Sequence, residues 1–392
     1  MSDPVAWTFA TGGDVVEQLE FLTDALPADT GPAQTRRLRQ WPRTLLRFDG
    51  QESGDGRRWL ETVLWHNGAG QWKVPLVMDA RPLLAAVALG AGSLAVDTSG
   101  ARFEPGGQAL LQGADARTFE LVDVEAVEDG ELVLSDETLR AWPSGTRVSP
   151  LRLGWLPALP SMGRFTSDDS AVYQAQFQLI DVLEQVAAYD GPVYRAYPVI
   201  EIRPVWVSDP SWVPERELVV IDEATTAPAV FDLVGQARDR VALQFALEGV
   251  AAIASFRKLL YALAGRWSPA WVPTWAQDLR VVADVADDAT TMDVRGPGLS
   301  AYPLANSRRD LRIELADGRV LYRRVTAAAA HTLSVDRLTL DVAIDDGFAV
   351  GDVVLVSFMA LSRQDSDVNA LRYFNWETVQ CELTFRGEVH AL

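Results

Sequence analysis

The sequence predicts a mainly β protein with a few short helices, in which a sheet-plus-helix unit occurs twice and each copy carries an inserted small β-barrel. Three observations lead to this prediction. Short alternating runs rich in β-branched residues, broken by Gly and Asp, dominate the chain. Two stretches with apolar residues at helical spacing stand at comparable places in the two halves. Four sequence blocks recur in the same order, which indicates a tandem duplication.

The length and composition indicate a folded protein of several domains. The chain has 392 residues, of which 48% are hydrophobic and 23% charged. A chain of this length suits two to four domains, each able to bury its own core. No apolar run approaches the roughly 20 residues that cross a bilayer, and the first residues lack a basic region followed by an apolar stretch. We therefore expect a soluble protein that is made in a cytoplasm.

The first recurring block ends a strand and is followed by a helix. "LRFDG" ends at Gly50 and "FALEG" ends at Gly249, which are 199 residues apart (249 − 50). On this alignment Phe48 corresponds to Leu247, and Leu46 to Phe245. Each block precedes a run with apolar residues at helical spacing, "RRWLETVLWHNG" (57–68) and "IASFRKLLYALAG" (253–265).

The second block is a strand with Trp and Pro, and two further blocks follow later. In "QWKVPLVMDA" (71–80) and "AWVPTWAQDL" (270–279), Trp72 and Pro75 match Trp271 and Pro273 if one residue is lost. Farther along, Trp142 matches Phe348. The alternating runs "YQAQFQLID" and "VQCELTFRG" match in the same order, so we expect each copy to end in a long strand.

The short strands between these blocks predict two small inserted barrels. "ELADGRVLY" in the second copy is a good hairpin, because Asp317 and Gly318 supply a turn between alternating strands. The predicted domains are a first sheet unit (1–79 plus 156–195), a first barrel (80–155), a second sheet unit (196–279 plus 361–392) and a second barrel (280–360). The long strands are expected around residues 36–48, 171–181, 240–248 and 377–389.

Residues for catalysis or metal binding are poorly supplied. There is no glycine-rich phosphate loop and no nucleophile elbow. Cys381, the single cysteine, lies in an alternating strand and is expected to be a small buried residue. Asp365, Asp367 and Asn369 have the spacing of a calcium loop, but Ala370 and Trp376 stand where such a loop needs Gly and Glu. We therefore predict no catalytic residue, no cofactor and no metal.

One basic segment predicts a contact surface. In "TRRLRQWPR" (35–43), the residues Arg37, Arg39, Trp41 and Arg43 alternate. In an extended strand they share one face. Such a face could pair with acidic neighbouring subunits. An equally good interpretation is an exposed strand edge whose charges prevent pairing with the strands of other chains.

The stretch "GRWSPAWVPTW" (265–275) carries three tryptophans that could stack on a sugar. Only Trp271 has a counterpart in the first copy, Trp72. We expect these two rings to be anchors that pack a helix against the sheet. Trp267 and Trp275 occur in the second copy alone, and we expect them at a domain or subunit contact.

The net charge of −19 opposes sequence-independent binding to nucleic acid from outside. A wall that repels phosphates would instead suit a channel through which DNA slides. An acidic surface kept for solubility is an equally good interpretation.

With "RLRQWPRTLLRF" near the start and "VQCELTFRGEV" at the end, the duplicated unit resembles tail-tip proteins of long-tailed bacteriophages, the distal-tail and baseplate-hub group with tail-tube-like domains. The resemblance implies a structural protein of the virion with no enzymatic activity. It would form a ring, as a homo-trimer with pseudo-six-fold symmetry or as a homo-hexamer.

The partners that the resemblance implies are the tail tube protein, the tape-measure protein and a downstream hub or fibre protein. DNA would only pass through a lumen, and no membrane would be bound. Two other classes stay open on the sequence. One is a carbohydrate-binding β-sandwich that uses the tryptophans, and the other is a polysaccharide-cleaving enzyme that adds paired acids such as Asp287 and Asp288.

Overall fold

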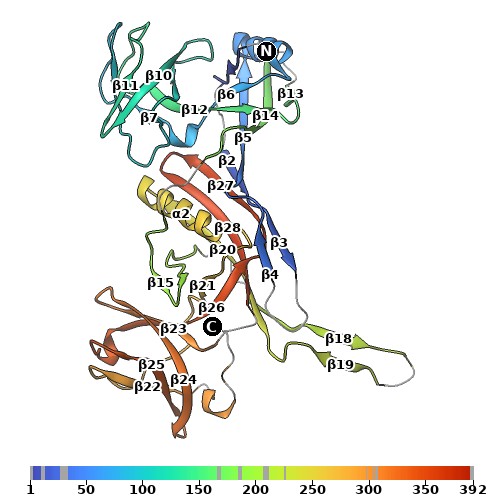
Figure 1. Ribbon diagram of the computed structural model, residues 1–392, viewed down its shortest axis with the longest axis vertical. Coiled ribbons are helices and arrows are strands. Elements are labelled where there is room, and N and C mark those ends of the chain that lie inside the picture. The colour runs from blue at the N-terminus through green and yellow to red at the C-terminus, as the bar shows by residue number, and fades with distance from the viewer. Residues whose placement is uncertain are drawn as a thin grey trace.

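The structure is a computed structural model that describes residues 3–9, 14–26, 34–165, 169–183, 188–205, 212–224, 227–296, 298–302, 304 and 308–388. Within these residues strands predominate and there are two α-helices, which confirms the prediction of a mainly β protein with few helices. Figure 1 shows an elongated molecule with a central sheet and two further groups of strands toward its ends.

The first half supplies strands and one helix to the central sheet. These elements are β1 (Val5–Ala6), β2 (Val15–Glu20), β3 (Thr23–Leu26), β4 (Gln34–Arg37), β5 (Arg43–Ser53), α1 (Gly54–Asn67), β6 (Trp72–Pro75), β12 (Arg147–Trp155), β13 (Ser161–Arg164) and β14 (Ser170–Leu179). A 3-10 turn and five strands lie between β6 and β12. They are η1 (Val77–Asp79), β7 (Arg81–Pro82), β8 (Ser93–Ala95), β9 (Gln108–Gln112), β10 (Phe119–Glu128) and β11 (Glu131–Leu134).

The second half has a similar series of elements. A connecting hairpin, β15 (Val193–Tyr194) and β16 (Tyr197–Pro198), precedes β17 (Trp212–Glu215), β18 (Leu218–Ile221), β19 (Ala229–Asp232), β20 (Arg238–Glu248), α2 (Val250–Leu263), β21 (Ala270–Pro273), β26 (Val353–Gln364), β27 (Val368–Asn375) and β28 (Thr378–Gly387). Between β21 and β26 lie β22 (Ala289–Arg295), η2 (Leu299–Ala301), β23 (Asp310–Leu315), β24 (Val320–Thr332), β25 (Val335–Ile344) and η4 (Val350–Asp352).

The central sheet is continuous across both halves. Its antiparallel order is β13, β14, β5, β2, β27, β28, β20, β17. Three of the predicted long strands are present with bounds shifted by a few residues. The fourth, predicted at 36–48, is wrong, because β4 ends at Arg37 and β5 begins at Arg43. Pro42 lies between them, and proline lacks the N–H that a strand interior needs.

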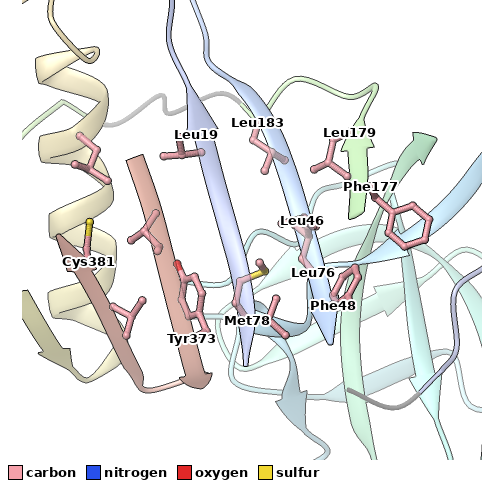
Figure 2. Packing of buried hydrophobic residues seen from close by; sticks show 14 of the residues in the cluster. Leu19, Leu46, Phe48, Leu76, Met78, Phe177, Leu179, Leu183, Tyr373 and Cys381 are labelled. Carbon is pink, nitrogen blue, oxygen red and sulfur yellow. The ribbon is translucent and has the colours of Figure 1, made fainter. Parts of the chain in front are cut away.

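One large core joins the two halves. It holds side chains from α1, α2 and strands of both halves, including Leu46, Phe177, Phe256 and Phe385. Figure 2 shows Tyr373 and Cys381 beside a helix on one side of this core and Leu46, Phe48 and Phe177 on the other. Cys381 is 4% exposed, as predicted for a small buried residue, and burial raises the pKa of its thiol to about 12. Two smaller cores lie within residues 83–148 and 279–358.

Each inserted segment forms a closed ring of paired strands. In the first, pairing runs from β12 through β9, β10, β11 and β8 to Leu83 and β7, and returns to β12. In the second, pairing runs from β26 through β23, β24, β25 and β22 to Val281. The ring closes because Leu279, just before Val281, bonds to Val356 of β26. β12 and β26 each extend from their ring into the central sheet, and the predicted boundary between residues 360 and 361 falls inside β26.

The same order of elements occurs in both halves. β5 and β20 each have 11 residues and lead into helices of 14 residues. β20 begins at Arg238, which is 195 residues after Arg43 at the start of β5 (238 − 43). The hairpins before them match at the same separation, since Thr23 pairs with Arg37 and Leu218 with Asp232.

This separation corrects the first sequence alignment. Phe48 was expected to correspond to Leu247, but the strand bounds make it correspond to Leu243, four residues earlier. Side chains in a strand alternate with a period of two, so an even shift preserves the apolar pattern and is invisible in the sequence. Trp142 and Phe348 do occupy matching places, because they bridge to Val87 and Val285 respectively.

Candidate assembly surface

The two halves meet where β2 pairs with β27. The ladder runs from Val15 opposite Tyr373 to Glu20 opposite Val368. Beside it, Nε of Arg372 donates a hydrogen bond to Oδ2 of Asp14 at 2.6 Å. Strands from opposite ends of the chain thus close one sheet.

A buried charge cluster lies directly behind this junction. Its members are Glu17 of β2, Asp79, Arg102, Arg257 of α2 and Tyr373 of β27. Arg257 Nη2 donates to Tyr373 Oη at 2.8 Å and to Asp79 Oδ1 at 3.2 Å. Tyr373 Oη donates to Glu17 Oε2 at 2.9 Å, and Arg102 Nε donates to Asp79 Oδ2 at 2.5 Å. Two carboxylates, from β2 and η1, therefore face two guanidinium groups, from the loop after β8 and from α2.

The paired charges keep both acids ionised. Burial alone would raise the pKa of Glu17 and Asp79, but attraction to Arg102 and Arg257 is larger in total and lowers the pKa of each below its ordinary value. The pKa of Arg257 is correspondingly raised despite burial. The cluster is electrically balanced, which favours a structural role in fixing how the two halves meet.

The β3–β4 hairpin of the first half lies against the second half. The backbone N–H of Thr23 donates to Oδ2 of Asp367 at 2.7 Å, and Nη1 of Arg363 donates to the hydroxyl of Thr35 at 3.2 Å. We call the group Tyr261, Arg363 and Asp367 the β3–β4 contact surface. Arg363 and Asp367 make polar contacts with the hairpin, whereas the ring of Tyr261 packs on Phe21 and Trp41, which flank the hairpin.

The predicted basic face is wrong as a single surface. Arg37 ends β4 and Arg43 begins β5, with the chain bending between them. Nε of Arg37 donates to the carbonyl of Arg39 at 2.8 Å, and Arg39 Nη1 donates to the carbonyl of Glu20 at 3.3 Å. The Trp41 ring packs on Tyr261 with centroids 6.1 Å apart. Three of the four side chains therefore have partners in their own chain, and Arg43 is exposed.

The three tryptophans of 265–275 do not form a common platform. Trp271 is 1% exposed. Trp267 is partly exposed, with the guanidinium of Arg37 5.4 Å from its ring centroid. The Trp275 ring is covered by Arg312 at 4.6 Å. Trp267 and Trp275 thus make contacts between segments of one chain.

Trp72 and Trp271 are both buried but on different sides. Trp72 is in the large core with residues of α1, as predicted for a helix-packing anchor. Trp271 is in a separate cluster with Val199 and Met359, and its indole N–H donates to the carbonyl of Tyr194 at 2.8 Å. The expectation of equivalent anchors is wrong. Pro75 pairs with Leu151 and Pro273 with Met359, so no residue is lost and Trp271 corresponds to Lys73, one residue beyond Trp72.

The β18–β19 hairpin is an exposed apolar ribbon that the sequence did not predict. Its side chains are exposed on both faces: Leu218, Val219, Val220, Ile221, Val230 and Phe231 are each 41% to 58% exposed. Figure 1 shows this ribbon projecting from the body. The signal was present, because "LVVI" and "AVFD" flank a polar loop, but apolar runs normally indicate a core. An isolated two-stranded ribbon is marginally stable in water, which favours a partner.

The first half carries a second exposed apolar group, Trp65, Trp155 and Leu159, which we call the Trp65 patch. Their exposures are 91%, 42% and 64%. Leu159 lies over the end of α1, where a Cβ added at Gly68 would be 2.8 Å from its Cδ2. Trp65 also borders an open hollow of about 600 Å³ on α1. Large exposed apolar patches are typical of interaction sites.

The two acids of the apparent calcium spacing have structural partners, and Oδ2 of Asp365 accepts a hydrogen bond from Nη2 of Arg240 at 2.8 Å. Asp367, part of the apparent calcium spacing, accepts hydrogen bonds from the backbone of Thr23 and Arg266. Within the described part of the chain, no three His, Cys, Asp or Glu side chains are placed to hold a metal ion. Neither described helix has the length and apolar character to cross a bilayer.

Comparison of the sequence with known protein families and with curated proteins finds no match in either set.

Proposed function

We propose that this protein is a structural component of a bacteriophage tail tip that forms a ring between the tail tube and the hub or fibres. The tape-measure protein would end within the ring, and DNA would pass through its lumen. The virion would be its place of action.

The junction of β2 with β27 carries this proposal. The order of the central sheet places one unit (β2, β5, β14, β13) beside a second (β17, β20, β28, β27). Among the described residues, β13 and β17 each pair on one side only and are the two ends of the sheet. β17 corresponds to β2, and β13 corresponds to β27.

A second copy could therefore repeat the internal junction. If β13 of one copy lies beside β17 of the next, the contact reproduces that of β27 with β2. Such a contact joins different surfaces and closes into a ring when the rotation permits. Three chains with two units each give six units, which would match a six-fold tube on one face and a three-fold tip on the other. A hexamer of whole chains is the competing arrangement.

The charge of the chain is compatible with a lumen for DNA. At a net charge of −19, a ring surface would repel phosphate and so allow DNA to slide without sticking. The sugar-platform alternative has less support, because only Trp267 of the three rings is more than one-third exposed.

The mass of the purified protein in solution tests the proposal. Light scattering behind size-exclusion chromatography should give about three times the chain mass of 42.9 kDa. Six times that mass would favour the hexameric ring. A monomer at the highest attainable concentration would contradict the proposed function.

A further inference from the structure

We propose that the β18–β19 hairpin of one copy docks on the Trp65 patch of the next copy. This inference rests on the proposed ring. It adds the residues that make the contact and the reason why the contact between chains is apolar.

The structure contains a template for this contact within one chain. The β3–β4 hairpin of the first half lies on the β3–β4 contact surface of the second half. If copies join as the two halves do, the hairpin of the second half must lie at the same place on the first half of the neighbouring copy.

The ladders identify that place. Tyr261 is the twelfth residue of α2, and Trp65 is the twelfth residue of α1. Leu151 corresponds to Met359, since each pairs with the proline of its neighbouring strand. Counting onward, Trp155 corresponds to Arg363 and Leu159 to Asp367. The three members of the β3–β4 contact surface thus correspond to the three members of the Trp65 patch.

Two pairs of residues across the hairpin contact are polar within the chain and apolar at the proposed contact between chains. Within the chain, Thr23 meets Asp367 and Thr35 meets Arg363. At the corresponding positions between chains, Leu218 would meet Leu159 and Val230 would meet Trp155. All four of these side chains are more than 40% exposed in the single chain. The two polar pairs within the chain are therefore matched by two apolar pairs between chains, which points to a second copy as the occupant.

The positions of the two surfaces fit a head-to-tail contact. Figure 1 shows β13, at the edge beside the Trp65 patch, toward one end of the long axis and the β18–β19 ribbon toward the other. The ribbon of one copy can then reach the patch of the next without folding back on its own chain. β17 is only four residues long and contains Pro214, so pairing of sheet edges alone would be weak. Apolar docking of the hairpin would add to it.

Engineered cysteines test this contact directly. One chain carries Val230→Cys and another carries Trp155→Cys, and the two are mixed under oxidising conditions. We expect a covalent dimer from the mixture and none from either variant alone. The double variant should give covalent species up to the full ring. The native Cys381 is buried and serves as the background.

Surface variants give the matching energetic test. Val220→Asp and Trp65→Ala should each weaken assembly about tenfold or more, because each removes an exposed apolar side chain from one side of the proposed contact. Leu333→Asp and Tyr302→Ala are the controls, since both side chains are highly exposed on the second insert. Circular dichroism and thermal melting of each monomer establish that the variants fold.

The outcomes separate the two proposals. A wild-type ring that gives no cross-link and is unchanged by Val220→Asp and Trp65→Ala would overturn the docking contact and leave the ring intact. A wild-type protein that never associates would overturn both. Cross-linking together with weakened assembly supports the contact.

Discussion

At the scale of single residues, the most constrained site is the charge cluster behind the β2–β27 junction. Glu17 and Asp79 are at most 1% exposed and are satisfied by Arg102, Arg257 and Tyr373. Removing one partner from a buried ion pair leaves an uncompensated charge, which is strongly destabilising.

We expect Arg257→Met to lower the free energy of unfolding by about 3–5 kcal/mol, because two buried carboxylates would then share one guanidinium group. The measurement is the urea unfolding midpoint. Arg58→Met is the control, since the Arg58 side chain is 60% exposed on α1 and its ion pairs are at the surface. Equal, small effects of the two variants would contradict the structural role of the cluster.

The same cluster predicts a pH dependence of stability. Because the pKa values of Glu17 and Asp79 are lower in the folded protein than their ordinary values of 4.5 and 3.8, these groups stabilise the fold above those values. That contribution is lost as the pH falls through the lowered pKa values. In Arg257→Met the pKa values of the two carboxyl groups rise toward or above their ordinary values, so the stability lost on acidification should be smaller than in the wild type. Parallel unfolding midpoints of the two proteins from pH 3 to pH 7 would refute this.

These residues could not be identified as a cluster from the sequence. Glu17 and Arg257 are far apart in the chain, and neither stands in a recognisable motif. A charged residue on the apolar face of a strand or helix was the only available signal, and without the β2–β27 pairing it has no identifiable partner.

At the scale of elements, the period of the apolar pattern predicts the helices and most long strands but not their register. The helices were expected at 57–68 and 253–265 and occur at Gly54–Asn67 and Val250–Leu263. The pattern could not place Phe48 against its true counterpart Leu243, because an even shift preserves the buried face. The sequence alignment also matched Trp271 with Trp72, which is one residue away from its counterpart Lys73. A shift of one residue moves a side chain to the other face of a strand.

The apolar pattern also could not show that the β18–β19 hairpin and Trp65 are exposed. An apolar run such as "LVVI" reads as core unless the ladder shows that it lies in a projecting ribbon. Trp65 likewise fits the apolar spacing of α1 yet is 91% exposed. Both features become visible only when the two halves are compared position by position.

The turn after α2 provides a test at this scale. Gly265 has a φ of +67°, and an added Cβ would lie 2.4 Å from Oδ1 and 2.8 Å from Cα of Asp367, which anchors the β3–β4 hairpin. Gly318 has a φ of +88° with open space around it. We expect Gly318→Ala to cost about 1–2 kcal/mol from backbone strain alone, and Gly265→Ala to cost more. Thermal melting of both variants makes the comparison, and equal losses would show that Asp367 does not constrain the turn.

At the scale of the whole molecule, the arrangement is asymmetric in a way that suits head-to-tail assembly. The two inserted rings of strands lie toward opposite ends of the molecule on one side of the sheet, and the β18–β19 ribbon projects on the other (Figure 1). Each half presents its hairpin in the same direction along the sheet. One such contact is made inside the chain, which leaves one hairpin and one patch free.

The most direct test of the central claim is the rotational symmetry of the purified assembly in electron microscopy images. We expect particles with three-fold symmetry in which six similar sheet units surround a central opening. A two-fold particle, or images that contain only single chains, would contradict it.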